Sequence, residues 1–214
     1  MELVKDVTRA ENLARRFQPF IYQEWKSIKD FPTSLIFDEE KTMEANLVWA
    51  INTPSLYFRM SEDNDYFYAF YMVFHPFDWS SSKLGFIRKL DSHTYDTESF
   101  CIRWSKLHGG YDLATIYHYS IKTKFGLGTI PCVRIEAESH AIMPFNPERE
   151  SINTVKYAVY HPNDFKLVNI DTIGLVQWKQ IKNILHRAGV DTPDTQTEHG
   201  DMFLHPDKLF KRRS

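Results

Sequence analysis

The sequence predicts a mainly β protein that forms a single domain. Aromatic residues make up 15% of the 214 residues, with 11 Tyr and 16 Phe, and aromatic side chains favour strands over helices. Strand-like runs follow one another closely between about residues 44 and 168, and we expect them to form the core. The chain shows no internal repeat and no linker of biased composition, so one domain over residues 1–214 is the simplest organisation.

The first predicted element is a short amphipathic helix over about residues 9–17. Thr8 and Glu11 have the spacing of a capping box. Apolar residues then recur at helical spacing, namely Ala10, Leu13, Ala14 and Phe17. Pro19 ends the helix, and the residues after it are predicted to form an extended arm on the body of the domain. Helix and arm together span about residues 8–35.

The predicted strands of the core come next. They are expected over residues 46–51, 55–60, 65–75, 99–104, 113–121, 131–141 and 155–160. The run at 66–74 is apolar or aromatic at every position, which is typical of a central strand covered on both faces. Residues 131–141 alternate between an apolar face and a polar face. The polar face carries Arg134, Glu136, Glu138 and His140.

The C-terminal part is predicted to contain a helix and a tail. Apolar residues recur at three- and four-residue spacing over residues 173–188, which indicates an amphipathic helix, and Gly189 follows at its end. Residues 191–214 are polar and are predicted to be loose. Both predicted helices are therefore peripheral to the strands.

Composition and charge argue against several classes of protein. A net charge of −2 and a pI of about 6.5 give no electrostatic reason to expect nucleic-acid binding. Cys101 and Cys132 each lie in a strand-like run and are expected to be buried free thiols. We find no signal peptide at the start and no eighteen consecutive apolar residues, so we expect synthesis in the cytoplasm and no transmembrane segment. Later release or association with a virion, and the oligomeric state, stay open.

The residues most suited to chemistry lie at the start of the predicted strand at 99–104. His93, Asp96 and Glu98 place an imidazole and two carboxylates within six residues. Strand alternation puts Asp96 and Glu98 on the side of Phe100, so two carboxylates begin a core-facing row. A divalent cation beside an imidazole is an economical way to neutralise such carboxylates. The alternative is a pair of carboxylates solvated at the mouth of a loop.

A further carboxylate, Asp78, follows the long aromatic strand. Pro76 and the serines after Trp79 indicate a loop at this point. If the strand that ends near His75 neighbours the strand that begins near His93, this loop brings Asp78 to the same place.

These residues resemble a known family. Residues 92–98, Ser-His-Thr-Tyr-Asp-Thr-Glu, are similar to the G-H-R-H-D-W-E heptapeptide of the necrosis- and ethylene-inducing-like proteins (NLPs). They also resemble the H-x-x-D-x-E core of the wider vacuolar-protein-sorting-associated group. Further segments match in the same order over roughly residues 10–145, namely the A-x-R-F-x-P-like opening at 13–19, the aromatic strand and loop aspartate at 70–78, the strand with an internal His at 116–120 and the S/G-H-A-like segment at 138–141.

The resemblance implies a β-sandwich with helices outside it and a divalent cation at one end. The ligands carried over position by position are Asp78, His93, Asp96 and Glu98. Three carboxylates and one imidazole suit magnesium, calcium or manganese better than a structural zinc. In the NLPs this cation helps to engage glycosylated sphingolipid headgroups. His140, in the S/G-H-A-like segment, is implied to lie in the ligand pocket or behind the metal ligands.

Three functional hypotheses follow. The first, which we prefer, is metal-dependent recognition of a glycan, a lipid headgroup or a phosphate-bearing ligand. The second is a metal-dependent hydrolase in which the cation activates water and His140 or Glu138 acts as general base. The third is a structural or accessory protein of a virus or mobile element with a structural metal. The sequence contains no Ser-His-Asp spacing, nucleophile elbow or phosphate loop, so nucleophilic and nucleotide-handling chemistry have no support.

Overall fold

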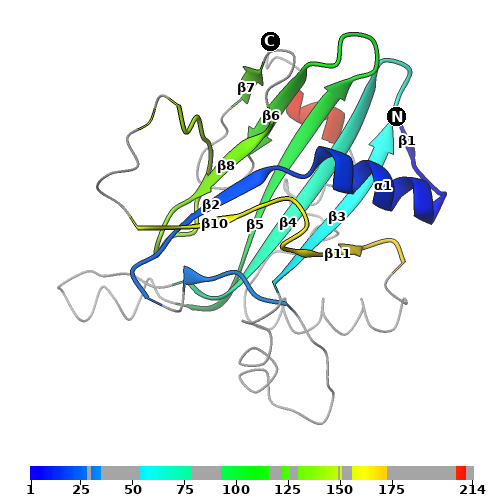
Figure 1. The fold of residues 1–214 in the computed structure, drawn as a ribbon. Helices are drawn as coiled ribbons and strands as arrows, with labels where there is room; N and C mark the ends of the chain where they lie inside the picture. The colour runs from blue at the N-terminus through cyan, green and yellow to red at the C-terminus, as the bar shows by residue number, and fades with distance from the viewer. Residues whose placement is uncertain are drawn as a thin grey trace.

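The protein is a β-sandwich, as the sequence predicts. The computed structural model describes residues 1–27, 30–34, 54–78, 93–115, 122–125, 130–148, 150, 156–172 and 206–210, and of residues 76–78, 93–97 and 122–125 it describes the backbone alone. Within these residues the chain forms two β-sheets and one α-helix (Figure 1). The element order confirms a mainly β fold with a peripheral N-terminal helix.

The larger sheet has β4 and β5 at its centre. Its described strands follow the order β1-β3-β4-β5-β6-β7, and β11 pairs in parallel with β3. Their bounds are β1 (Glu2–Leu3), β3 (Ser55–Glu62), β4 (Tyr66–Asp78), β5 (His93–Ser105), β6 (Tyr111–Thr115), β7 (Lys122–Phe125) and β11 (Lys166–Asn169). Successive residues of β4 from Tyr68 to His75 are all buried, which confirms the prediction of a central strand covered on both faces.

The smaller sheet contains a strand that the sequence analysis missed. Its order is β10-β2-β8-β9, with bounds β2 (Phe20–Glu24), β8 (Cys132–Ile135), β9 (Ile142–Pro144) and β10 (Tyr157–Tyr160). The extended backbone predicted after Pro19 is confirmed for residues 20–24, but these residues form a strand of the sheet instead of an unpaired arm. These residues pair with β10 on one side and in parallel with β8 on the other. Both partners lie more than a hundred residues downstream, so no local signal marks this pairing.

Helix α1 (Val7–Phe17) begins earlier than predicted. Asp6 is its N-cap, and the Asp6 carboxylate accepts a hydrogen bond from the Arg9 backbone N–H at 2.9 Å. The capping box predicted at Thr8 is therefore wrong, because Asp6 already satisfies a free N–H group of the first turn. The helix buries Ala10, Ala14 and Phe17. It lies across β3 and β4 on the larger sheet (Figure 1).

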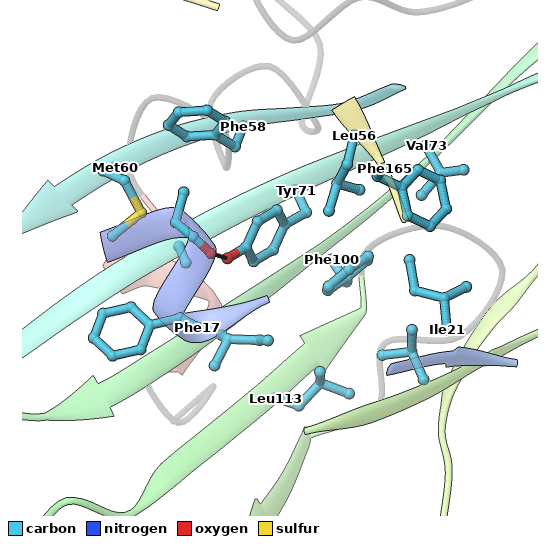
Figure 2. Close-up of a cluster of buried hydrophobic side chains, with 14 of the residues drawn as sticks. Phe17, Ile21, Leu56, Phe58, Met60, Tyr71, Val73, Phe100, Leu113 and Phe165 are labelled. Atoms are coloured by element: carbon cyan, nitrogen blue, oxygen red, sulfur yellow. Dashed lines mark hydrogen bonds between the residues drawn. The ribbon is translucent and has the colours of Figure 1, made fainter. Parts of the chain in front are cut away.

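The core lies between the larger sheet on one side and α1 with the smaller sheet on the other. Figure 2 shows side chains from α1, both sheets and the β10–β11 connection packed together. The labelled members are Phe17, Ile21, Leu56, Phe58, Met60, Tyr71, Val73, Phe100, Leu113 and Phe165. The Tyr71 hydroxyl donates a hydrogen bond to the Ala14 carbonyl oxygen at 2.5 Å, which ties α1 to the centre of the sheet.

The opposite face of β4 contacts a short C-terminal element. The 3-10 helix η2 (Pro206–Phe210) places the Phe210 ring centroid 6.2 Å from that of Tyr68, and the Arg103 guanidinium lies 4.4 Å from the Phe210 centroid. Leu209 is buried. The prediction of a loose tail over residues 191–214 is therefore wrong for residues 206–210, because their apolar side chains pack on the sheet.

Three predicted elements lie outside the described residues. They are the strand at 46–51, the part of the strand at 116–121 that carries His118, and the helix at 173–188. Among the helices that the structure describes, none combines the length and the apolar composition needed to cross a bilayer.

The Tyr71 hydrogen bond gives a test of how α1 is held. Tyr71→Phe leaves the buried Ala14 carbonyl without this donor, so we expect the free energy of unfolding to fall by about 1–2 kcal/mol in urea denaturation. Tyr66→Phe is the matched control, because the partly exposed Tyr66 hydroxyl makes no hydrogen bond within the described residues, and it is expected to change stability by less than about 0.5 kcal/mol. Equal effects of the two substitutions would contradict this account of α1.

Candidate functional site at the end of β4 and β5

The pairing of β4 with β5 gathers the four predicted metal-ligand positions at one end of the larger sheet. In the antiparallel register Asp78 lies opposite His93, and Asp96 lies opposite His75. Glu98 lies opposite Val73. The sequence analysis assumed that these two strands are neighbours, and the register confirms it. The loop predicted at Pro76 is wrong, because β4 continues to Asp78 and pairs there with β5. The side chains of Asp78, His93 and Asp96 lie outside the described part of the structure, so their role as ligands stays a prediction.

Glu98 is the one predicted ligand whose side chain is described. It is 2% exposed, and it begins a row that continues with the fully buried Phe100 and Ile102. The core-facing carboxylate row is therefore confirmed at Glu98. The alternative of a solvated carboxylate at a loop mouth does not apply to this residue. A carboxylate at such a place interacts more strongly with a cation than an exposed one, because the effective dielectric constant is lower.

The core next to Glu98 is polar instead of apolar. Four side chains from four different segments form a connected buried polar cluster, and each is 0% exposed. The members of this cluster are Gln23 of β2, Asp30, His75 of β4 and His140. His75 follows Val73 on the core-facing side of β4, so the cluster lies on the same side of the sheet as Glu98.

His75 is fixed within this cluster by two contacts. Its Nε2 lies 3.0 Å from Gln23 Oε1, and its ring stacks on that of His140 with centroids 3.9 Å apart and an interplanar angle of 5°. Burial, and then the proximity of His140, hold the pKa of His75 well below its usual value. The ring is therefore neutral at physiological pH.

Asp30 joins two loops through one carboxylate. Its Oδ2 accepts hydrogen bonds from the backbone N–H groups of Lys26 at 2.8 Å and Ser27 at 2.9 Å, and its Oδ1 accepts one from Glu138 at 2.8 Å. His140 Nε2 lies 3.6 Å from the same Oδ1. Burial alone would raise the pKa of Asp30, but His140 and the three N–H groups outweigh it and hold the pKa well below its usual value. Asp30 is thus ionised at physiological pH.

The segment that carries His140 is a turn and not a strand. β8 ends at Ile135, residues 137–139 form a turn, and β9 begins at Ile142. The strand predicted over residues 131–141 is therefore confirmed for residues 132–135 and wrong for the part that carries Glu138 and His140. Glu138 and His140 have φ values of 73° and 50°, in the left-handed region that few residues other than glycine adopt. The hydrogen bond from Glu138 N–H to Asp30 helps to hold this conformation.

The two candidate general bases are both engaged in holding that turn. Glu138 Oε1 forms an ion pair with Lys26 Nζ at 3.0 Å. His140 is fully buried between His75 and Asp30. A general base has to reach the proton that it removes, and these contacts direct both side chains toward protein groups. Their positions therefore favour a structural role over proton transfer.

A second polar feature lies at the opposite end of the sheet. A pocket of about 470 Å³ is lined by Met1, Glu2, Glu62, Asp63, Asn64 and Lys106. Its central carboxylate, Glu62, is paired with Arg9 at 2.5 Å and with Lys106 at 2.7 Å. Glu62 is thus neutralised by the chain itself, so this pocket is a weaker candidate for a ligand site than the end of β4 and β5.

Metal ligation is not decided by the described side chains. Within that set, no three His, Cys, Asp or Glu residues gather closely enough to hold an ion. Three of the four predicted ligands fall outside the set, as noted above.

Comparison with known proteins shows a likeness of fold without a likeness of sequence. No protein-family profile and no curated protein matches the chain. Among solved structures, a triple mutant of NLPPya matches with a TM-score of 0.51 and 11% identity over 94% of this chain and 92% of that chain. NLPPya in complex with mannosamine matches with a TM-score of 0.46 and 11% identity over 99% and 95%. Necrosis and Ethylene inducing Protein 2, from the causal agent of cocoa's Witches Broom disease, matches with a TM-score of 0.46 and 12% identity over 95% and 92%. The first of these likenesses shows that the chain has the fold of an NLP structure.

The residues of the buried polar cluster carry little signal in the sequence. Asp30 and Gln23 were not candidates, because each gains its role from partners that lie far along the chain. Asp30 contacts Glu138, which is 108 residues away, and Gln23 contacts His75, which is 52 residues away. In the sequence the His75-Pro76 pair indicates a strand end, although β4 continues to Asp78, and nothing local indicates that His75 stacks on another histidine.

The central place of Asp30 predicts a pH-dependent loss of stability. Asp30→Asn keeps the size of the side chain but removes the charge and one acceptor oxygen, so we expect the free energy of unfolding at pH 7 to fall by about 2 kcal/mol. Asp65→Asn, at an exposed carboxylate whose side chain makes no bond in the described structure, is the matched control and is expected to be neutral.

The sign of the pH effect follows from the direction of the pKa shift. The folded pKa of Asp30 lies below its ordinary value of 3.8, so its contribution is complete above that value and is lost as the pH falls toward the folded pKa. In urea denaturation between pH 6 and pH 3, the gap between wild type and Asp30→Asn should begin to narrow below about pH 4. A gap that widens on acidification would overturn this assignment.

Proposed function

We propose that the end of β4 and β5 binds a divalent cation and uses it to recognise a glycan, a lipid headgroup or a phosphate-bearing ligand. The observation that carries this proposal is the register of β4 and β5. In this register Asp78 lies opposite His93, and Asp96 and Glu98 follow three and five residues further along β5. Asp78 and His93 are directly opposed and so lie close to one another, and Asp96 and Glu98 lie two residues apart on one face of β5.

The donor set fits a hard divalent cation. Asp78, His93, Asp96 and Glu98 would hold the ion, through three carboxylates and one imidazole. Oxygen-rich sets of this kind suit magnesium, calcium or manganese. The burial of Glu98 supports the fit, because a carboxylate with little contact to water is already partly desolvated before the ion arrives. The ion would supply a positive charge that polar oxygens of a ligand can approach.

We favour recognition over hydrolysis because both candidate general bases are held by other protein groups. The general bases considered from the sequence, His140 and Glu138, are held by Asp30, His75 and Lys26. A fixed cation surrounded by rigid side chains is well suited to bind vicinal hydroxyls or a phosphate, since binding of a preorganised site loses little conformational entropy. The ligand chemistry we propose is therefore a set of closely spaced oxygen atoms.

Metal binding is tested by thermal unfolding with and without cation. We expect Mg²⁺, Ca²⁺ or Mn²⁺ at a hundred times its dissociation constant to raise the Tm of the wild type by roughly 5–10 °C, and a chelator to reverse the rise. Asp96→Ala should show no rise, whereas the control Asp65→Asn should behave as wild type. Metal content of the purified protein, measured by mass spectrometry, gives an independent readout. A wild type without bound metal and without a rise in Tm contradicts the proposal.

Ligand recognition is tested on an array of glycans and lipid headgroups. NLPPya is described in complex with mannosamine, so amino sugars are among the first ligands to include. We expect retention of the wild type in the presence of the cation, loss of retention with a chelator, and no retention of Asp96→Ala. Retention that a chelator leaves unchanged would show that any ligand site is independent of the ion.

A further inference from the structure

The protonation of His75 can be assigned from its neighbours. Gln23 Nε2 donates a hydrogen bond to the Glu24 carbonyl oxygen at 2.9 Å, which fixes the orientation of the Gln23 amide. Gln23 Oε1 therefore faces His75, at 3.0 Å from Nε2. An amide oxygen can only accept, so His75 Nε2 carries the hydrogen. In a neutral ring the other nitrogen, Nδ1, then presents a lone pair.

That lone pair has no partner in the described structure. His75 Nδ1 is buried and makes no hydrogen bond to any described residue. Native proteins rarely leave a buried acceptor unsatisfied, and such a group calls for an explanation. Neither the stacking on His140 nor the hydrogen bond to Gln23 uses this atom.

The position of His75 in the β4–β5 register indicates a candidate partner for this lone pair. His75 lies directly opposite Asp96 in the β4–β5 register, and it is two residues from Val73, which lies opposite Glu98. By strand alternation His75 therefore shares one face of the sheet with Asp96 and Glu98, two of the positions that we propose to hold the cation. It is also held more rigidly than a surface residue, because Gln23 and His140 fix its ring.

We propose that His75 Nδ1 is an additional ligand of the divalent cation, so that the site contains two imidazoles. This inference rests on the proposed function, because it requires that the ion binds at this end of β4 and β5. It adds a ligand that the sequence analysis did not select. His140 and Gln23 would then act as supports that set the orientation of the His75 ring, as residues behind metal ligands commonly do.

A second imidazole changes the metal preference of the site. Nitrogen donors suit transition metals, whereas magnesium and calcium prefer oxygen donors. With His75 and His93 both ligating, Mn²⁺ should bind more tightly than Mg²⁺ or Ca²⁺. His75→Gln retains a polar side chain of similar length but has no imidazole, and we expect it to lower the affinity for Mn²⁺ by about tenfold or more and to reduce this preference.

The number of coordinated imidazoles can be counted directly. Electron spin echo modulation of the Mn²⁺-loaded protein reports the ¹⁴N nuclei of bound imidazoles. We expect two in the wild type, one in His93→Ala and one in His75→Gln. His108→Ala, in an exposed turn at the other end of the sheet, is the matched control and should retain two.

The outcomes separate this inference from the proposed function. One imidazole in the wild type that disappears in His93→Ala overturns the role of His75 and leaves the metal site in place. A wild type that binds no Mn²⁺ overturns both. If His75→Gln does not fold, His93→Ala still decides, because a remaining imidazole in that variant supports His75 and the absence of one excludes it.

Discussion

The carboxylate of Asp30 is the interaction on which the polar end of this sandwich depends. It accepts backbone hydrogen bonds from Lys26 and Ser27 in one loop and from Glu138 in another, and it lies beside His140. The second loop holds two residues in left-handed conformations, which cost free energy unless their surroundings support them. Asp30 thus sets the place of His140, and the stacked rings carry that constraint to His75 in the central strand.

The apolar half of the fold could be predicted because its signals are local. The run at 66–74 is apolar at every position, and it became β4, the best-covered strand of the larger sheet. The strand β2 was missed because its partners, β8 and β10, are distant in the sequence. The alternation of Arg134, Glu136, Glu138 and His140 is typical of a strand, but the chain turns at residues 137–139, where the Glu138 N–H donates a hydrogen bond to the distant Asp30.

Some residues of the candidate site can be predicted from local sequence, and others depend on distant partners. The spacing of His93, Asp96 and Glu98 can be read from one short segment, and the burial of Glu98 agrees with the predicted core-facing row. The role that we propose for His75 depends on its contacts with Gln23 and His140 and on the β4–β5 register, none of which is local in the sequence. A histidine before a proline is an ordinary strand end in a sequence. In the structure His75 is neutral and fully buried, and its Nδ1 lone pair makes no hydrogen bond to a described residue.

The polar cluster lies away from α1, at the end of the sandwich where we propose the cation site. At the end near α1 the two layers are joined by apolar side chains and by the hydrogen bond of Tyr71. At the end near Glu98 the same space between the sheets is filled by amide, imidazole and carboxylate groups that bond to one another. Such groups are costly to bury unless they are satisfied, and satisfied networks are rigid. Rigidity is the property that a cation site requires, because ligands fixed before binding lose little entropy when the ion arrives. Burying these polar groups costs free energy. In return their contacts hold His75 in one orientation next to the positions that we propose for the cation.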